Sequence, residues 1–334
     1  MRNNFENGIL VILKSIMTEK PMNGGMLEKR IEDERQKILR AHQYAVTAGT
    51  PQERRISALI KRELLSTEWA RKTFADIREL LIAYFKDSLL NTQNSQYVHD
   101  RTQRLLSEVA ERGKTKIVSG EEHLGAVPKK SPVFLMTNHL GLYKLATINP
   151  EPELGLDDFG AEKMFPLPLF HASNKPVADA LGDGLYIGAF EFPGKVGQIQ
   201  KTAGGVVIRL AEEENLTSDG TSGIDYLTHQ TKGFIERYPN GALSVLPEGG
   251  TSGKRNGGGP YSLETFRTGA FVIAARLSIP ILPVPQYFNP QKGFEVAVLE
   301  PIYPNKDMNR EEFTEMANLT REKMQKWLDE RKGR

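Results

Sequence analysis

Two stretches of the chain have residue types and spacing that suit chemistry, and the first carries a histidine. An apolar run at residues 133–136 ends in Thr137, Asn138 and His139, and a glycine follows at position 141. A short apolar run of this kind is typical of a buried strand, and a turn after it presents the last side chains to a cleft. An imidazole in that place can take a proton from a hydroxyl group and later return it to a leaving group. A single histidine is more often structural than catalytic, so the neighbouring stretches must support this interpretation.

The second stretch, residues 245–255, reads VLPEGGTSGKR. Its glycines let main-chain amides approach a ligand closely, and the two cations at its end suit a phosphate. It is not a P-loop, because both the glycine spacing and the lysine-hydroxyl ending differ. The simpler interpretation is a flexible glycine loop without a ligand. As a binding loop, its predicted members are Glu248, Gly249, Gly250, Thr251, Ser252, Lys254 and Arg255.

A third stretch, GGVVIRL at residues 204–210, predicts a strand that delivers Arg209 at its end. An arginine there is usually a surface ion-pair residue, but it can also clamp a phosphate or a carboxylate. A fourth stretch, RLSIPILPV at residues 276–284, predicts the end of a helix that runs into a buried strand bounded by prolines.

The elements that position these residues alternate between strands and helices. Apolar runs that predict strands occur at residues 117–118, 133–136, 185–187, 206–208, 243–246 and 279–284. Helical spacing between and after them predicts helices at 225–237, 266–277 and 310–331. This alternation predicts an α/β sandwich for residues 113–334, with a central mixed, largely parallel sheet flanked by helices.

Residues 1–112 predict a helical region that packs on or beside the α/β part. Helical spacing is clear from position 51, at 77–85 and at 105–109, and looser at 21–48. An alternative for residues 5–17 is an amphipathic, weakly basic helix on a membrane surface.

Composition narrows the classes of function. The 334 residues carry a formal net charge of +2, which does not favour nucleic acid as a partner. The chain has no cysteine, which rules out disulfides and thiolate chemistry and fits a reducing compartment. No apolar run approaches the roughly 18 to 20 residues that span a bilayer. We therefore expect a cytoplasmic protein, at most peripheral on a membrane. No histidine or carboxylate pair has metal-ligand spacing, so we expect no metal and a zinc hydrolase is poorly supported.

Taken together and in this order, the four stretches resemble the motif blocks of the glycerophospholipid acyltransferase superfamily, which includes lysophosphatidic acid and glycerol-3-phosphate acyltransferases. Here the blocks read NHLGLYK, GGVVIRL, LPEGGTSGKR and IPILPV. Two further segments are similar to family members: IVSGEEHL at residues 117–124, and FRTGAFVIAARL, which leads into the fourth block. The resemblance covers roughly residues 114 to 302.

The resemblance implies transfer of a fatty acyl group from a thioester to a hydroxyl of a phosphorylated glycerol or lysophospholipid. The donor would be acyl-CoA or acyl carrier protein as a co-substrate, with no bound cofactor. His139 would be the general base, and Glu248 would be a second catalytic residue that shapes the acceptor site with the glycines beside it. Asn138 would contact the substrate. Phosphate binding would fall to Arg209, and to Lys254 and Arg255. The segment HASNKP lies where relatives place a basic segment, which suggests His171 and Lys175 as further phosphate ligands.

One position departs from the family pattern, because Lys144 stands where the family has an aspartate five residues after the histidine. That carboxylate orients the imidazole and stabilises its protonated form, which a lysine cannot do. Lys144 is instead either a phosphate ligand or a solvated helix residue. Three consequences remain open: another carboxylate substitutes, the histidine works unassisted, or the chain is a degenerate homologue that binds a lipid or acyl carrier without catalysis. The candidate substitutes are Asp157, Asp158, Asp179, Asp183 and Glu248.

Overall fold

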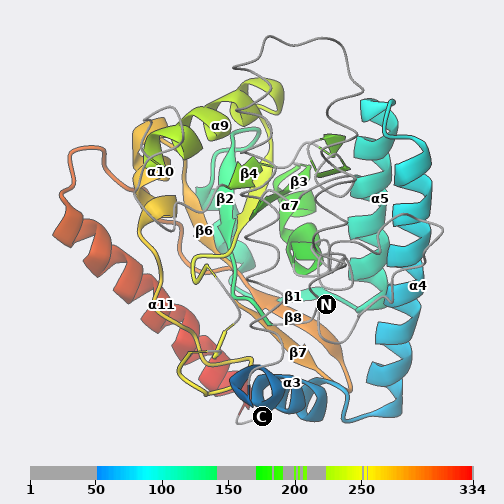
Figure 1. Cartoon of the computed structure of the whole chain (residues 1–334). Coiled ribbons are helices and arrows are strands. Elements are labelled where there is room, and N and C mark those ends of the chain that lie inside the picture. Colours follow the sequence, from blue (N-terminus) through cyan, green and yellow to red (C-terminus); the bar gives the residue numbers. More distant parts are fainter. Residues whose placement is uncertain are drawn as a thin grey trace, which may run out of the picture.

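The structure is a computed structural model (Figure 1). It describes residues 51–140, 171–182, 184–190, 199–200, 202–203, 206–208, 223–249, 252–253 and 255–332. Within these residues the chain forms a mixed α/β fold, as the alternating pattern predicts.

The main sheet has five parallel strands in the order β4-β3-β5-β2-β6. Their bounds are β2 Val133–Met136, β3 Leu185–Phe190, β4 Val206–Ile208, β5 Ala242–Val245 and β6 Ile281–Pro283. Every residue of β2 and β5 is buried, which is usual for central strands whose two faces are both covered. These strands occupy the predicted apolar runs, so the parallel core of the fold is confirmed.

A second sheet of three strands has the order β1-β8-β7. Strand β1 (Lys116–Ser119) pairs in parallel with β8 (Gly293–Ala297), and β8 pairs antiparallel with β7 (Gln286–Asn289). The sequence analysis predicted β1 but neither β7 nor β8. Strand β7 follows β6 after only two residues, so the second sheet begins directly beside the end of the first.

Helices lie on both sides of the main sheet (Figure 1), with α4 and α5 on one side and α9, α10 and α11 on the other. Their bounds are α4 Glu68–Leu90, α5 Ser95–Arg112, α9 Gly223–Arg237, α10 Gly269–Leu277 and α11 Arg310–Lys332. Shorter helices are α3 Pro51–Leu64, α7 Lys175–Leu181, and the 3-10 turns η1 Glu121–Ala126 and η6 Ala172–Asn174.

Helices α4 and α5 begin at polar residues that cap them. The hydroxyl of Thr67 accepts a hydrogen bond from the N–H of Ala70 at 3.1 Å, and the side chain of Asn94 accepts one from Tyr97 at 3.0 Å. Both helices bury apolar faces in the same core as the sheet. The predicted helical region is therefore present from position 51. The segments 5–17 and 21–48, which were also predicted as helical, lie outside the described residues.

Candidate functional site

His139 and Glu248 leave the main sheet at the same edge. Strand β2 runs parallel to β5 with Met136 opposite Val245, and the N–H of Thr137 donates to the carbonyl of Val245 at 3.0 Å. The two stretches that follow these strands therefore start side by side, at the carboxyl ends where α/β proteins commonly bind ligands. Although His139 and Glu248 are 109 positions apart in the chain, they come into contact.

The Glu248 carboxylate fixes the main chain around His139. Its Oε1 accepts hydrogen bonds from the His139 N–H at 3.1 Å and from the Ser252 hydroxyl at 2.6 Å. The Ser252 N–H donates in turn to the His139 carbonyl at 2.9 Å, and the Glu264 N–H donates to Glu248 Oε2 at 2.8 Å. Glu248 and Ser252 thus hold His139 through its main-chain N–H and carbonyl groups.

Glu248 is fully buried, and its donors are a hydroxyl and two peptide groups. Burial raises its pKa from 4.5 to about 7, and the hydrogen bonds from Ser252, Glu264 and His139 oppose that rise. Glu248 therefore acts on His139 through the main chain, as a positioning residue.

Asn138 ties the end of β2 to the start of β7. Its side-chain oxygen accepts the N–H of Gln286 at 2.8 Å, and its side-chain N–H donates to the Gln286 carbonyl at 3.1 Å. The Gln286 amide donates back to the Asn138 carbonyl at 2.6 Å and accepts a hydrogen bond from the Ser173 hydroxyl. These contacts give Asn138 a structural task, and its role in substrate binding stays a prediction.

His171 lies buried against strand β5. Its Nδ1 is 2.6 Å from the hydroxyl of Ser244, which also accepts a hydrogen bond from the Asn174 amide at 2.7 Å. Burial, and secondarily the charge of His139, lowers the pKa of His171 to about 3, so its imidazole is neutral near pH 7. A neutral ring can offer phosphate a hydrogen bond but no charge. The predicted phosphate role of His171 therefore depends on hydrogen bonding alone.

Lys175 pairs with Asp179 one turn later on α7. This ion pair engages both a predicted phosphate ligand and one of the five carboxylates considered as substitutes for the family aspartate. Among those carboxylates, Glu248 contacts the His139 peptide group. The other three, Asp157, Asp158 and Asp183, lie outside the described residues.

The glycines after Ser252 serve the packing of their own loop. Gly253 has φ +67°, and a Cβ on it would come within 2.0 Å of the Gly259 carbonyl oxygen. The Glu264 carboxylate accepts the N–H groups of Arg255 at 2.5 Å and Asn256 at 3.1 Å. The described residues from Arg255 to Glu264 are therefore linked by hydrogen bonds within their own loop, and whether the stretch 245–255 binds a ligand stays a prediction.

Other predicted site residues lie outside the described part of the chain: Lys144, Arg209, Gly250, Thr251 and Lys254. Their roles stay predictions.

Ser244, Gln286 and Glu264 also belong to the network but were not predicted as site residues. The sequence around each of them contains no motif, and only the pairing of distant segments brings them to the site. A serine within the apolar run of β5 was the one available signal.

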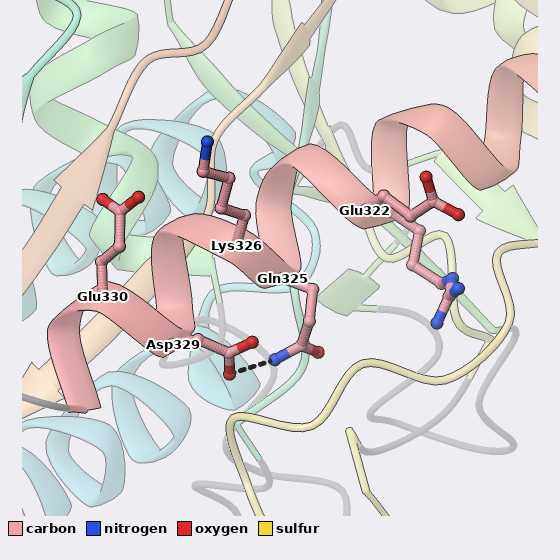
Figure 2. A pocket seen from close by; sticks show the side chains of 6 residues that line it. Glu322, Gln325, Lys326, Asp329 and Glu330 are labelled. Carbon is pink, nitrogen blue, oxygen red and sulfur yellow. Dashed lines mark hydrogen bonds between the residues drawn. The ribbon is translucent and has the colours of Figure 1, made fainter.

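Among the residues that the structure describes, no cluster of histidine and carboxylate side chains could hold a metal ion. Within the same residues, no helix has the length and apolar character to cross a membrane. A pocket on the surface of α11 (Figure 2) is lined by Arg321, Glu322, Gln325, Lys326, Asp329 and Glu330, none of which is a predicted site residue.

Comparison with known proteins finds a distant structural resemblance. No family model matches the sequence, and no curated protein matches it. Among solved structures, the chain is similar to the crystal structure of the 1-acyl-sn-glycerophosphate (LPA) acyltransferase PlsC from Thermotoga maritima. The two share 18% sequence identity over 82% of this chain and 97% of that chain, with a TM-score of 0.45. That likeness is too distant to assign residue roles, which have to be argued from the contacts of this chain.

Proposed function

We propose that the protein is an acyltransferase that moves a fatty acyl group from a thioester to a hydroxyl of a phosphorylated acceptor. The observation that carries this proposal is the meeting of two motifs. The Asn138-His139 pair and the Glu248-Gly249 turn come from distant parts of the chain, and the Glu248 carboxylate holds the His139 peptide group. A histidine whose backbone is fixed at the carboxyl edge of a parallel sheet suits a general base.

In the proposed reaction, His139 removes the proton of the acceptor hydroxyl as its oxygen attacks the thioester carbonyl. The tetrahedral intermediate collapses with cleavage of the carbon–sulfur bond, and the imidazolium returns the proton to the departing thiolate. Main-chain N–H groups near the turn after Glu248 would stabilise the oxyanion. Acyl-CoA or acyl carrier protein would be the donor, and glycerol 3-phosphate or a lysophospholipid the acceptor.

A second candidate function is binding of a lipid or an acyl carrier without catalysis. Lys144 favours it, because a lysine in place of the family aspartate cannot stabilise a protonated imidazole.

The test is consumption of an acyl thioester by the purified full chain. Acyl-CoA and acyl-carrier-protein donors would each be offered with glycerol 3-phosphate and with lysophosphatidic acid. Under the proposal, His139→Ala abolishes turnover, whereas His229→Ala, at an exposed position on α9, leaves it unchanged. Lys144→Asp restores the family carboxylate and is expected to raise kcat.

Two outcomes would contradict the proposal that the protein is an acyltransferase with His139 as its general base. One is a wild-type protein that binds a donor without turning it over. The other is turnover that survives His139→Ala. The first outcome would support the binding function instead.

A further inference from the structure

Two arginine side chains lie against the same peptide unit, the one that joins Glu248 to Gly249. The Nη2 of Arg255 donates a hydrogen bond to the Glu248 carbonyl at 2.9 Å. The Nε of Arg267 lies 2.7 Å from the place where a Cβ on Gly249 would be. Gly249 also has φ +62°, so both its conformation and this contact require a residue without a side chain.

A main-chain hydrogen bond fixes the position of Arg267. Its main-chain N–H donates to the Pro247 carbonyl at 2.8 Å, which holds the main chain of Arg267 beside the Glu248 turn. The residue then lies two positions before α10 begins at Gly269. Arg255 is likewise anchored, because its N–H donates to the Glu264 carboxylate.

Neither guanidinium forms an ion pair with a carboxylate in the described part of the chain, and both residues are exposed. The two nearby carboxylates are otherwise occupied. Glu264 accepts main-chain N–H groups, and Glu248 is buried with a pKa raised to about 7. Two cations brought to one peptide unit repel each other unless an anion lies between them. Their placement therefore suits binding of an external anion.

Two contacts through Glu248 link this arginine pair to His139, the proposed general base. The carboxylate of Glu248, whose carbonyl Arg255 contacts, accepts the His139 N–H. An anion held by the pair would therefore lie on the same turn that positions the imidazole.

We propose that Arg267 and Arg255 together bind the phosphate monoester of the substrate, with Arg267 as a ligand that the four motif blocks do not include. This inference deepens the proposed function and rests on it for the identity of the substrate. Guanidinium groups suit the task because each can offer phosphate two parallel N–H donors.

The experiment measures equilibrium binding of glycerol 3-phosphate, lysophosphatidic acid and coenzyme A by isothermal titration of the full chain, with glycerol as the ligand without phosphate. Arg267→Gln is expected to weaken binding of the phosphorylated acceptor by about tenfold or more, since a charged hydrogen-bond donor is lost. Arg267→Lys keeps the charge without the planar fork and is expected to lose less. Arg104→Gln, at an exposed position on α5, is the matched control and should bind like the wild type.

The three ligands separate the sources of the phosphate. Loss confined to glycerol 3-phosphate and lysophosphatidic acid supports an acceptor site, whereas loss confined to coenzyme A, or unchanged binding in Arg267→Gln, overturns the inference. A wild-type chain that binds no phosphorylated ligand overturns it too.

A turnover assay distinguishes a failure of this inference from a failure of the proposed function. Turnover with an unchanged KM in Arg267→Gln would refute the arginine pair and leave the acyltransferase standing. Binding that depends on Arg267 in a chain without turnover would keep the pair and refute the acyltransferase.

Discussion

Replacing Glu248 with glutamine should change how the stability of the protein depends on pH. The pKa of this carboxyl is raised from 4.5 in its ordinary state to about 7 in the fold. Between these two values the folded protein holds a proton that the unfolded chain has released. The free energy of unfolding therefore falls as the pH rises through this window, and above the upper value the folded state carries the full cost of a buried charge.

The magnitude follows from the width of the window. From 4.5 to about 7, the buried carboxyl costs about 3 kcal/mol of stability in total. Glu248→Gln removes the charge and with it the pH-dependent term. The amide cannot accept all three hydrogen bonds, which adds a cost of about 1–3 kcal/mol that does not vary with pH. The variant should therefore gain about 2 kcal/mol relative to the wild type between about pH 5.5 and about pH 8.5.

The assay is urea unfolding of both proteins across this range, followed by far-ultraviolet circular dichroism. The constant cost cancels when the difference between variant and wild type is compared at the two ends. Glu330→Gln, which removes an exposed carboxylate of α11 (Figure 2), is the control for a general change in net charge. A stability difference for Glu248→Gln that is flat with pH, or that falls as the pH rises, would refute a buried carboxyl with a raised pKa.

Three further substitutions, one of them a control, test the packing of the site. Ser244→Ala leaves His171 and Asn174 without their buried partner, so the free energy of unfolding should fall by about 1–3 kcal/mol, measured by urea unfolding; an unchanged value would contradict the observed contacts. Gly249→Ala and Gly257→Ala both place a side chain at positive φ and should each cost about 1–2 kcal/mol, but only Gly249→Ala meets an arginine and should also weaken phosphate binding in isothermal titration. Equal loss of binding in the two variants would contradict the contact with Arg267.

The elements of the fold were largely predictable from the sequence, because each depends on a local pattern. The apolar runs at residues 133–136 and 206–208 match β2 and β4 at both ends, and the helical spacing at 225–237 falls within α9. Strands β7 and β8 were missed. Strand β7 begins only two residues after β6, and polar residues (Gln286, Asn289 and Glu295) interrupt the apolar residues of both short strands.

The site was predictable in part. Motif spacing pointed to Asn138, His139, Glu248 and Ser252; the last three contact one another, and Asn138 contacts Gln286. Their partners were not predictable, because a hydrogen bond such as that between Asn138 and Gln286 depends on the meeting of segments 148 positions apart. Arg267 was part of a recognised pattern, but its contact with Gly249 exists only in three dimensions.

These contacts separate two properties that a catalytic histidine needs, its position and its polarisation. The position of His139 depends on peptide groups: its N–H meets Glu248 and Ser252, and its carbonyl meets the Ser252 N–H. Residue 144 lies outside the described residues, and the described support of the His139 backbone comes from Glu248 and Ser252. Polarisation is the property that an aspartate supplies, by stabilising the protonated ring. Under the proposed function, a carboxylate at position 144 would add the second property to a backbone that Glu248 and Ser252 already hold, so Lys144→Asp is expected to act on kcat rather than on the fold.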